Sequence, residues 1–408
     1  MIAAPRWNPA LLGFACPVCA RLVAPADTLR DPICAACAQP LLARYDFERV
    51  RVSQPREALG RNGRDLWRYG EVLPFTRPCP ELRLGEGGTP LVPLPRLARA
   101  LGLGELWLKD EAANATQSFK ARGLSLAVHG ALALNRGAIA LPSAGNAGSA
   151  AAAYAAAAGL RCRIAIPKDT PEPFVLEQRA LGADVKLVQG TIADAGRALG
   201  AWAPPPEWWN VATFREPFRL EGKKTLGLEI AEQLEWRLPD SIFYPTGGGT
   251  GLVGMWRAFD ELRTLGWIRD ASPRLVSVQA AGCAPVVRAY ESGATRTEAW
   301  EGAVTQASGL RVPSPFAGPL ILTAVRETHG WASAVSEDAM LDGMLELARE
   351  AGCFACPEGG ATLAALRSAR ASNQVREGER VVIFNTGSGL KYPEAWRVAL
   401  ARAGARHA

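Results

Sequence analysis

The chain has 408 residues, of which 48% are hydrophobic and 21% charged, and its formal net charge is +6. This length predicts two to three domains, and the composition excludes a mainly disordered chain. The charge is mild and forms no Lys/Arg block, so we expect neither a nucleic-acid nor a membrane partner. The apolar stretch 144–160 is too short and too rich in alanine to cross a bilayer, and residues 1–15 lack a secretory pattern. We therefore expect a soluble cytoplasmic protein.

The first recognisable module along the chain contains four cysteines. Cys16, Cys19, Cys34 and Cys37 form two C-x2-C pairs with fourteen residues between them. Two such pairs can present four thiolates to one Zn²⁺ in a closed, structural site, the arrangement of a zinc ribbon. Two disulfides in a secreted domain are the alternative, and the lack of a secretory pattern argues against them.

The remaining chain alternates strand-like and helix-like stretches, which predicts α/β domains built on largely parallel sheets. We expect a zinc-ribbon-like module at 1–45, a connecting arm at 46–105, a smaller α/β domain at 106–210 and a larger one at 211–408. The expected strands are 106–109, 138–142, 162–166, 185–188, 241–244, 275–278 and 381–384. The expected helices are 119–135, 147–158, 172–181, 192–202, 252–265, 337–350 and 361–370.

Four strand-to-helix turns contain unusual residues, and ligands of open parallel sheets bind at such turns. The turns are 114–123, 142–148, 246–251 and 385–391. Lys120 opens a helix and could form a Schiff base if partial burial favours its neutral amine, although many such lysines are simply solvated.

The other three turns offer small or hydroxylated residues. Asn146 is either a ligand or a helix cap, and the free N–H groups of its turn suit a carboxylate. The glycine run 247–249 exposes several amides to one oxyanion, and Thr386 offers a hydroxyl. Together with a nucleophilic lysine, this set suits pyridoxal phosphate.

At these residues the sequence resembles the threonine synthase branch of the fold-type-II pyridoxal phosphate enzymes. The resemblance covers nearly the whole chain and includes the cysteine module, the Lys120 turn and the segments 84–91, 217–225 and 386–391. It implies two open, twisted, largely parallel-sheet domains with the cofactor in the cleft between them, and a homodimer.

The resemblance also implies roles for individual residues. It makes Lys120 the catalytic, Schiff-base lysine and places an amino-acid substrate beside it. The cofactor's 3′-oxygen would contact Asn146, its ring nitrogen would contact Thr386, and its phosphate would be bound by Gly247, Gly248, Gly249, Thr250 and Gly251. The substrate carboxylate would be bound by Ser143, Ala144 and Gly145, and the leaving phosphate by Arg219 and Lys224.

Departures from the family pattern leave two reactions open. Ala121 stands where threonine synthases usually have Asp, and Thr213 and Phe214 stand where they have Asn and Ser. The first reaction is that of threonine synthase, from O-phospho-L-homoserine and water to L-threonine and phosphate. The second is a threonine or serine ammonia-lyase (dehydratase), which gives a 2-oxo acid and ammonia and needs no second phosphate site. A catalytically dead binding protein is a third reading, against which the intact Lys120 argues.

Overall fold

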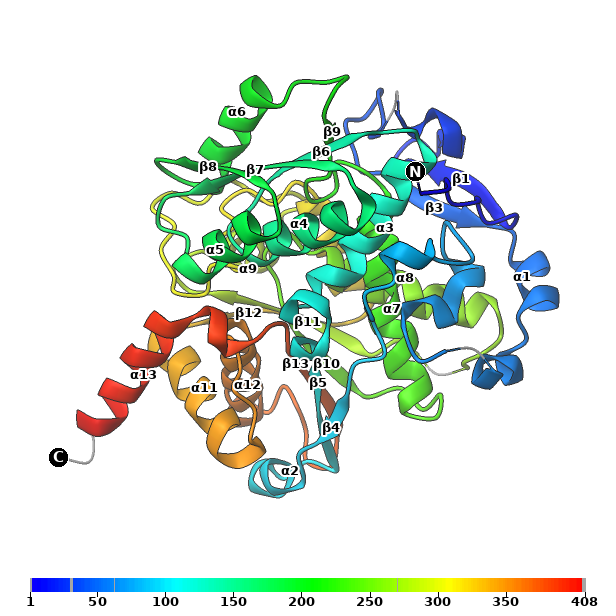
Figure 1. Cartoon of the computed structure of the whole chain (residues 1–408). Helices are drawn as coiled ribbons and strands as arrows, with labels where there is room; N and C mark the ends of the chain where they lie inside the picture. The colour runs from blue at the N-terminus through cyan, green and yellow to red at the C-terminus, as the bar shows by residue number, and fades with distance from the viewer. Residues whose placement is uncertain (1, 30–31, 62, 270, 406–408) are drawn as a thin grey trace. The chain divides into compact units, whose positions relative to one another are not determined.

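The computed structural model describes residues 2–29, 32–61, 63–269 and 271–405. They form two compact units, each assembled from three separate stretches of chain. Figure 1 labels helices and strands of the chain and colours it by residue number. The first unit comprises Met1–Gly88, Asn114–Glu229 and Arg257–Arg269. The second comprises Thr89–Ala113, Ile230–Trp256 and Asp270–Ala408. The four contiguous domains expected from the sequence stay a prediction.

The first unit contains two sheets. A three-stranded antiparallel sheet in the order β2-β1-β3 follows the N-terminus, and a four-stranded parallel sheet has the order β8-β7-β6-β9. The strands are β1 Leu11–Ala15, β2 Leu22–Val23, β3 Leu42–Tyr45, β6 Ala138–Pro142, β7 Arg161–Pro167, β8 Asp184–Val188 and β9 Trp209–Asn210. The helices are α1 Phe47–Ser53, α3 Lys120–Ala133, α4 Asn146–Ala158, α5 Glu172–Ala180, α6 Ile192–Trp202 and the larger part of α7 Phe218–Gln233.

The second unit contains one six-stranded sheet in the order β12-β11-β10-β13-β5-β4. All neighbouring strands are parallel except the edge pair β4 and β5. The strands are β4 Leu91–Pro93, β5 Glu105–Asp110, β10 Ser241–Pro245, β11 Arg274–Ala280, β12 Ala332–Val335 and β13 Arg380–Asn385. The helices are α2 Pro95–Leu101, α8 Thr250–Thr264 (whose second half belongs to the first unit), α9 Pro285–Glu291, α10 Gly318–Glu327, α11 Glu337–Ala351, α12 Pro357–Ala371 and α13 Pro393–Ala405.

Short 3-10 turns connect these elements. They are η1 Pro25–Leu29, η2 Arg56–Arg61, η3 Leu66–Val72, η4 Pro80–Leu82, η5 Glu111–Ala113, η6 Ala115–Gln117 and η7 Gly389–Lys391. The central strands are continuous apolar runs because helices cover both faces of a parallel sheet, and all five residues of β10 are buried. The architecture confirms the predicted fold class: two mainly parallel sheets and a small N-terminal sheet with the cysteine module.

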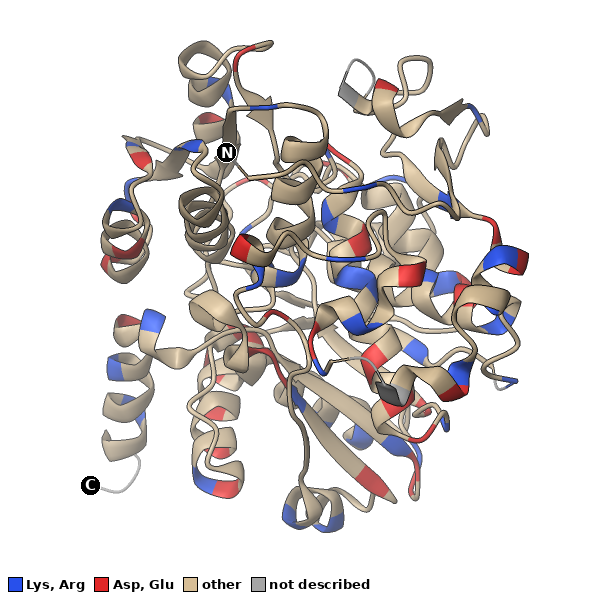
Figure 2. Cartoon of the chain, turned by 45° about the vertical axis from the view of Figure 1, so that its right-hand side comes forward, with Lys and Arg blue, Asp and Glu red and all other residues tan. Residues whose placement is uncertain are grey.

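Figure 2 shows Lys/Arg and Asp/Glu segments interspersed along the described chain. Among the described residues, no helix combines the length and the apolarity needed to cross a membrane.

Candidate active site

Lys120 is the first residue of α3 and belongs to the first unit. It is half-buried, and its Nζ lies 3.9 Å from the centroid of the Phe119 ring. The N-terminus of a helix is the positive end of its dipole, so this place disfavours an ammonium and favours a neutral, nucleophilic amine.

The turn after β6 leads into α4, which begins at Asn146. The Ser143 hydroxyl accepts hydrogen bonds from Gly145 N at 3.1 Å and Gly148 N at 2.8 Å, so Ser143 shapes the turn itself. Gly145 has φ +138°, and a Cβ there would lie 3.0 Å from the Phe174 ring. The turn therefore requires glycine and leaves backbone N–H groups at the start of α4, which suit an anion.

The glycine loop Gly247–Gly251 joins β10 to α8 in the second unit. A Cβ on Gly247 would lie 2.2 Å from Gly309 O, and one on Gly251 would lie 1.9 Å from the Tyr244 hydroxyl. Gly249 has φ +79°, and its Cβ would lie 2.3 Å from Ile321 Cδ1. The loop is thus a bare backbone cradle at a helix N-terminus, which fits the phosphate of pyridoxal phosphate.

Thr386 follows the last residue of β13 and is 5% exposed. Its Oγ1 lies 3.7 Å from the Cys356 Sγ, and the Asn385 Oδ1 accepts from Cys356 N at 3.2 Å. Burial raises the pKa of the Cys356 thiol, so Cys356 stays protonated and neutral beside Thr386. The Asn385 Nδ2 donates to Asp110 Oδ1 at 2.8 Å, which fixes the end of the strand that presents Thr386.

The sequence analysis missed Glu358, a buried carboxylate that supports the glycine loop. Its Oε1 accepts from Gly309 N at 2.8 Å and from the Tyr392 hydroxyl at 3.0 Å. Gly309 in turn packs against Gly247. The available signal was an acidic residue in the first turn of a helix, directly after Cys356 and Pro357.

Arg219 and Lys224, expected at the leaving phosphate, both lie buried on α7. Arg219 donates to Val211 O at 2.8 Å, and burial lowers its pKa to about 10. Burial also raises the pKa of the neighbouring Glu216 to about 7. No described group accepts a hydrogen bond from the Arg219 Nε.

Lys224 already has three partners. Its Nζ lies 2.6 Å from the Glu221 carboxylate, 2.8 Å from that of Glu261 and 2.6 Å from Val72 O. The structure therefore places this ammonium inside an ion-pair network, and its expected contact with the substrate stays a prediction.

Segment 84–91 contains a second buried carboxylate, Glu86. It accepts hydrogen bonds from Trp67 Nε1 at 2.9 Å, Ser125 Oγ at 2.8 Å and the Tyr154 hydroxyl at 2.9 Å. These donors come from η3, α3 and α4, so Glu86 ties the helix that begins at Lys120 to its neighbours.

The four cysteines of the N-terminal module converge. Their Sγ atoms all lie within 4.8 Å of one another, which makes a site able to hold a metal ion. Both pairs form the same turn: Ala20 N donates to Cys16 O and Ala38 N to Cys34 O, and both alanines have positive φ.

The four thiols influence one another's ionisation. The pKa of Cys34 falls to about 7 because the Cys37 backbone hydrogen-bonds to its sulfur. The pKa of Cys37 rises to about 12, mainly because its thiol hydrogen-bonds to Cys19. Crowded thiols cannot all ionise without a cation, and a divalent metal would allow it.

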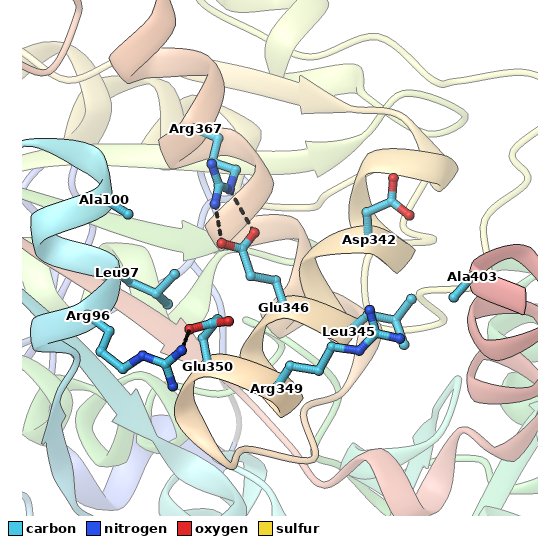
Figure 3. Close-up of a pocket in the computed structure, with 10 residues that line it drawn as sticks. All are labelled: Arg96, Leu97, Ala100, Asp342, Leu345, Glu346, Arg349, Glu350, Arg367 and Ala403. Atoms are coloured by element: carbon cyan, nitrogen blue, oxygen red, sulfur yellow. Dashed lines mark hydrogen bonds and ion pairs between the residues drawn. The ribbon is translucent and has the colours of Figure 1, made fainter. Parts of the chain in front are cut away.

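A separate cavity of about 550 Å³ lies in the second unit among α2, α11, α12 and α13 (Figure 3). Arg96 pairs with Glu350 at 2.8 Å, and Arg367 donates through Nε to Glu346 at 2.7 Å. None of the predicted site residues lines this cavity. They divide instead between the first unit (Lys120, Ser143, Ala144, Gly145, Asn146, Arg219 and Lys224) and the second (Gly247, Gly248, Gly249, Thr250, Gly251 and Thr386).

Comparison with known proteins identifies the family. Residues 82–387 match the sequence profile of the family described as "Pyridoxal-phosphate dependent enzyme". The chain belongs to this family. The predicted resemblance is confirmed, and the match extends over the Lys120 turn, the glycine loop and Thr386.

Within the family, this enzyme groups with the threonine synthases. It is 33% identical to the threonine synthase of Methanocaldococcus jannaschii over 86% of each chain. It is also 33% identical to that of Methanosarcina acetivorans, over 90% of this chain and 91% of the other. The processed form of threonine deaminase isoform 2 from Solanum lycopersicum superposes with a TM-score of 0.64, covering 76% of this chain and 88% of the other. That likeness, at 21% identity, shows the fold alone.

Proposed function

We propose that this enzyme is a threonine synthase, which converts O-phospho-L-homoserine and water to L-threonine and inorganic phosphate. The observation that carries the proposal is the 33% identity to two threonine synthases over nearly the whole chain. Pyridoxal phosphate, when bound, supplies an electron sink for the electron pair released at the substrate α carbon.

Residues of this chain attach the cofactor, move protons and bind the substrate. Lys120 attaches the cofactor and moves protons at the α and β carbons of the substrate. The cofactor phosphate is bound by Gly247, Gly248, Gly249, Thr250 and Gly251. The cofactor's 3′-oxygen contacts Asn146, and its ring nitrogen contacts Thr386. The substrate carboxylate is bound by Ser143, Ala144 and Gly145. The bare backbone of the glycine loop supports its assignment.

Arg219 is our candidate for the substrate phosphate, because its Nε is a buried donor without an acceptor among the described residues. A buried arginine binds phosphate strongly since its hydrogen bonds are charge-assisted. Lys224 was expected to bind the same phosphate. Its ammonium already contacts Glu221, Glu261 and Val72 O, so its contact with the phosphate is less well supported than that of Arg219.

The test is a product assay with purified enzyme and O-phospho-L-homoserine. Inorganic phosphate and threonine are measured for the wild type, for Lys120→Ala and for Lys168→Ala, a matched control at an exposed lysine. We expect equimolar phosphate and threonine from the wild type and the control, and none from Lys120→Ala. A wild type that loads the cofactor and releases no phosphate would refute the proposal.

An ammonia-lyase acting on threonine or serine is the second candidate. Phe214, where threonine synthases place a polar residue, is 2% exposed, and the Lys224 ammonium is occupied by two carboxylates. Both observations weaken a second phosphate site. The same samples incubated with threonine or serine and assayed for 2-oxo acid distinguish this reaction from the synthase.

We also propose that Cys16, Cys19, Cys34 and Cys37 bind one structural Zn²⁺. The Cys19 and Cys34 Sγ atoms are 3.6 Å apart, close to the roughly 3.8 Å that Zn–S bonds of about 2.3 Å impose in a tetrahedron. A homodimer in the cytoplasm rests on the family resemblance, and light scattering of the purified enzyme tests the dimer.

A further inference from the structure

Gln178 is a buried glutamine of α5 to which the proposed reaction gives no role. Its side chain is 0% exposed, and its Nε2 donates a hydrogen bond to Gly145 O at 3.2 Å. Because a carbonyl oxygen only accepts, the Gln178 amide must present its NH2 group to Gly145. The Gln178 Oε1 is buried as well and has no hydrogen-bond donor among the described residues.

The stability of the fold does not explain a glutamine at this place. A buried acceptor without a donor destabilises the folded chain, because it has lost its hydrogen bonds to water. The amide also restricts the neighbouring helix α4, since a Cβ on Gly148 would lie 2.6 Å from Gln178 Nε2. An apolar side chain of the same length would fill the space without the unpartnered acceptor.

The hydrogen bond from Gln178 fixes one peptide group of the turn expected to bind the substrate carboxylate. The carbonyl and the N–H of a planar trans peptide point in opposite directions. Holding Gly145 O towards Gln178 of α5 therefore turns the N–H of the next residue, Asn146, away from α5. Asn146 is the first residue of α4, so this peptide sets the direction of the N–H groups at the start of that helix.

Other N–H groups of the same turn are divided between the protein and a ligand. Those of Gly145 and Gly148 donate to Ser143 Oγ at 3.1 Å and 2.8 Å. Those of Ala144 and Ala147 have no acceptor among the described residues, so they are available to an anion.

We propose that Gln178 is a positioning residue for the substrate carboxylate: its amide holds the Gly145 carbonyl so that N–H groups at the start of α4 face the bound anion, although its buried Oε1 destabilises the fold. This rests on the proposed function, in which the turn at Ser143, Ala144 and Gly145 binds that carboxylate. The carboxylate is bound alike in the ground state and the transition state, so Gln178 should act on KM and not on kcat.

The experiment compares KM, kcat and Tm of the wild type, Gln178→Met, Gln178→Glu and the control Arg179→Met, with O-phospho-L-homoserine as substrate. Methionine keeps the length of the side chain and removes both polar atoms, whereas glutamate places an oxygen opposite Gly145 O. Arg179 is the next residue of α5 and is exposed. The competitive inhibitor 3-aminopropyl phosphate is the substrate without its carboxylate, so its binding should not depend on the turn.

We expect Gln178→Met to raise KM about fivefold, with kcat unchanged within about twofold, because one neutral hydrogen bond is lost. Gln178→Glu should raise KM further, and Arg179→Met should follow the wild type. The inhibition constant of 3-aminopropyl phosphate should be the same in Gln178→Met and the wild type. The Tm of Gln178→Met should equal or exceed that of the wild type, whereas loss of a merely structural residue would lower it.

Three results would overturn the inference. They are an unchanged KM in Gln178→Met, an equal weakening of 3-aminopropyl phosphate, and a Gln178→Met enzyme that is less stable than the wild type or does not fold.

Failure of the proposed function appears separately, as a wild type that forms no threonine from O-phospho-L-homoserine. The KM values for threonine and serine in the 2-oxo acid assay then test Gln178 in the same way, because both substrates have the α-carboxylate. A wild type that converts none of the three substrates refutes both the function and the inference.

Discussion

Lys224→Met tests whether the buried network on α7 is structural. The Lys224 ammonium is completely buried between Glu221 and Glu261, each only 1% exposed. The Tyr45 hydroxyl donates to Glu221 at 2.7 Å, and Arg257 lies 3.4 Å from Glu261. Methionine fills the space of the lysine stem and leaves two buried carboxylates without the cation that lies between them.

The expected cost follows from this geometry. Removing one partner of a buried ion pair costs about 3–5 kcal/mol, because the remaining charge is left uncompensated in a poorly polarisable interior. Here two carboxylates lose their shared cation, so we expect the upper half of that range. The charge of Arg257 at 3.4 Å and the Tyr45 hydrogen bond compensate only in part.

The assay is urea-induced unfolding followed by circular dichroism, with Lys168→Met as the matched control. The control should stay within about 0.5 kcal/mol of the wild type, as exposed substitutions usually do. The combination of Lys224→Met with Glu221→Gln should lose less than the single variant does, because one uncompensated charge disappears. A Lys224→Met enzyme with wild-type stability and a raised KM for O-phospho-L-homoserine would refute the structural role and favour the expected phosphate contact.

Three further predictions concern the glycine loop, the buried histidine and the cysteine module. Gly249→Ala should reduce affinity for pyridoxal phosphate at least tenfold in a fluorescence titration, because its Cβ would collide with Ile321 at a φ of +79°. His129 is buried and neutral with a pKa lowered to about 4, so the unfolded chain binds its proton first as the pH falls below about 6.5. Unfolding free energy should fall by about 3 kcal/mol between pH 6.5 and 4, and His129→Asn should flatten this part of the profile. Cys34→Ser should lower the zinc content measured by atomic absorption and the Tm together; full zinc content would contradict the site.

The sequence predicts the elements of the fold more completely than their arrangement. The expected strand 138–142 and helix 192–202 match β6 and α6 residue for residue. Hydrophobic periodicity did not predict helix α7. Its charged residues face the interior in ion pairs, so the helix has no apolar stripe. A short strand such as 106–109 is recognisable from its residues, but only the register with β13 and β4 shows which sheet it joins.

The candidate site shows the same difference between residues that can be recognised in the sequence and contacts that form only in the folded chain. Lys120, Asn146 and the glycine run were recognisable because each follows an apolar strand and opens a helix. The partners of Lys224 were not, since Glu261 is 37 residues away and reaches it only in the folded chain.

The charge balance of the first unit bears on the choice between the two reactions. Among its described residues, five buried cations face five buried carboxylates: Arg122, Arg219, Lys223, Lys224 and Arg257 against Glu86, Glu216, Glu221, Glu229 and Glu261. A substrate phosphate with two negative charges needs a compensating proton in such an interior. On the proposed assignment of the substrate phosphate to Arg219, Glu216 is the group placed to take this proton, because its pKa of about 7 allows protonation near neutrality. Threonine and serine bring no phosphate dianion into this interior, so on this assignment we expect proton uptake on substrate binding for the synthase reaction and not for the ammonia-lyase reaction.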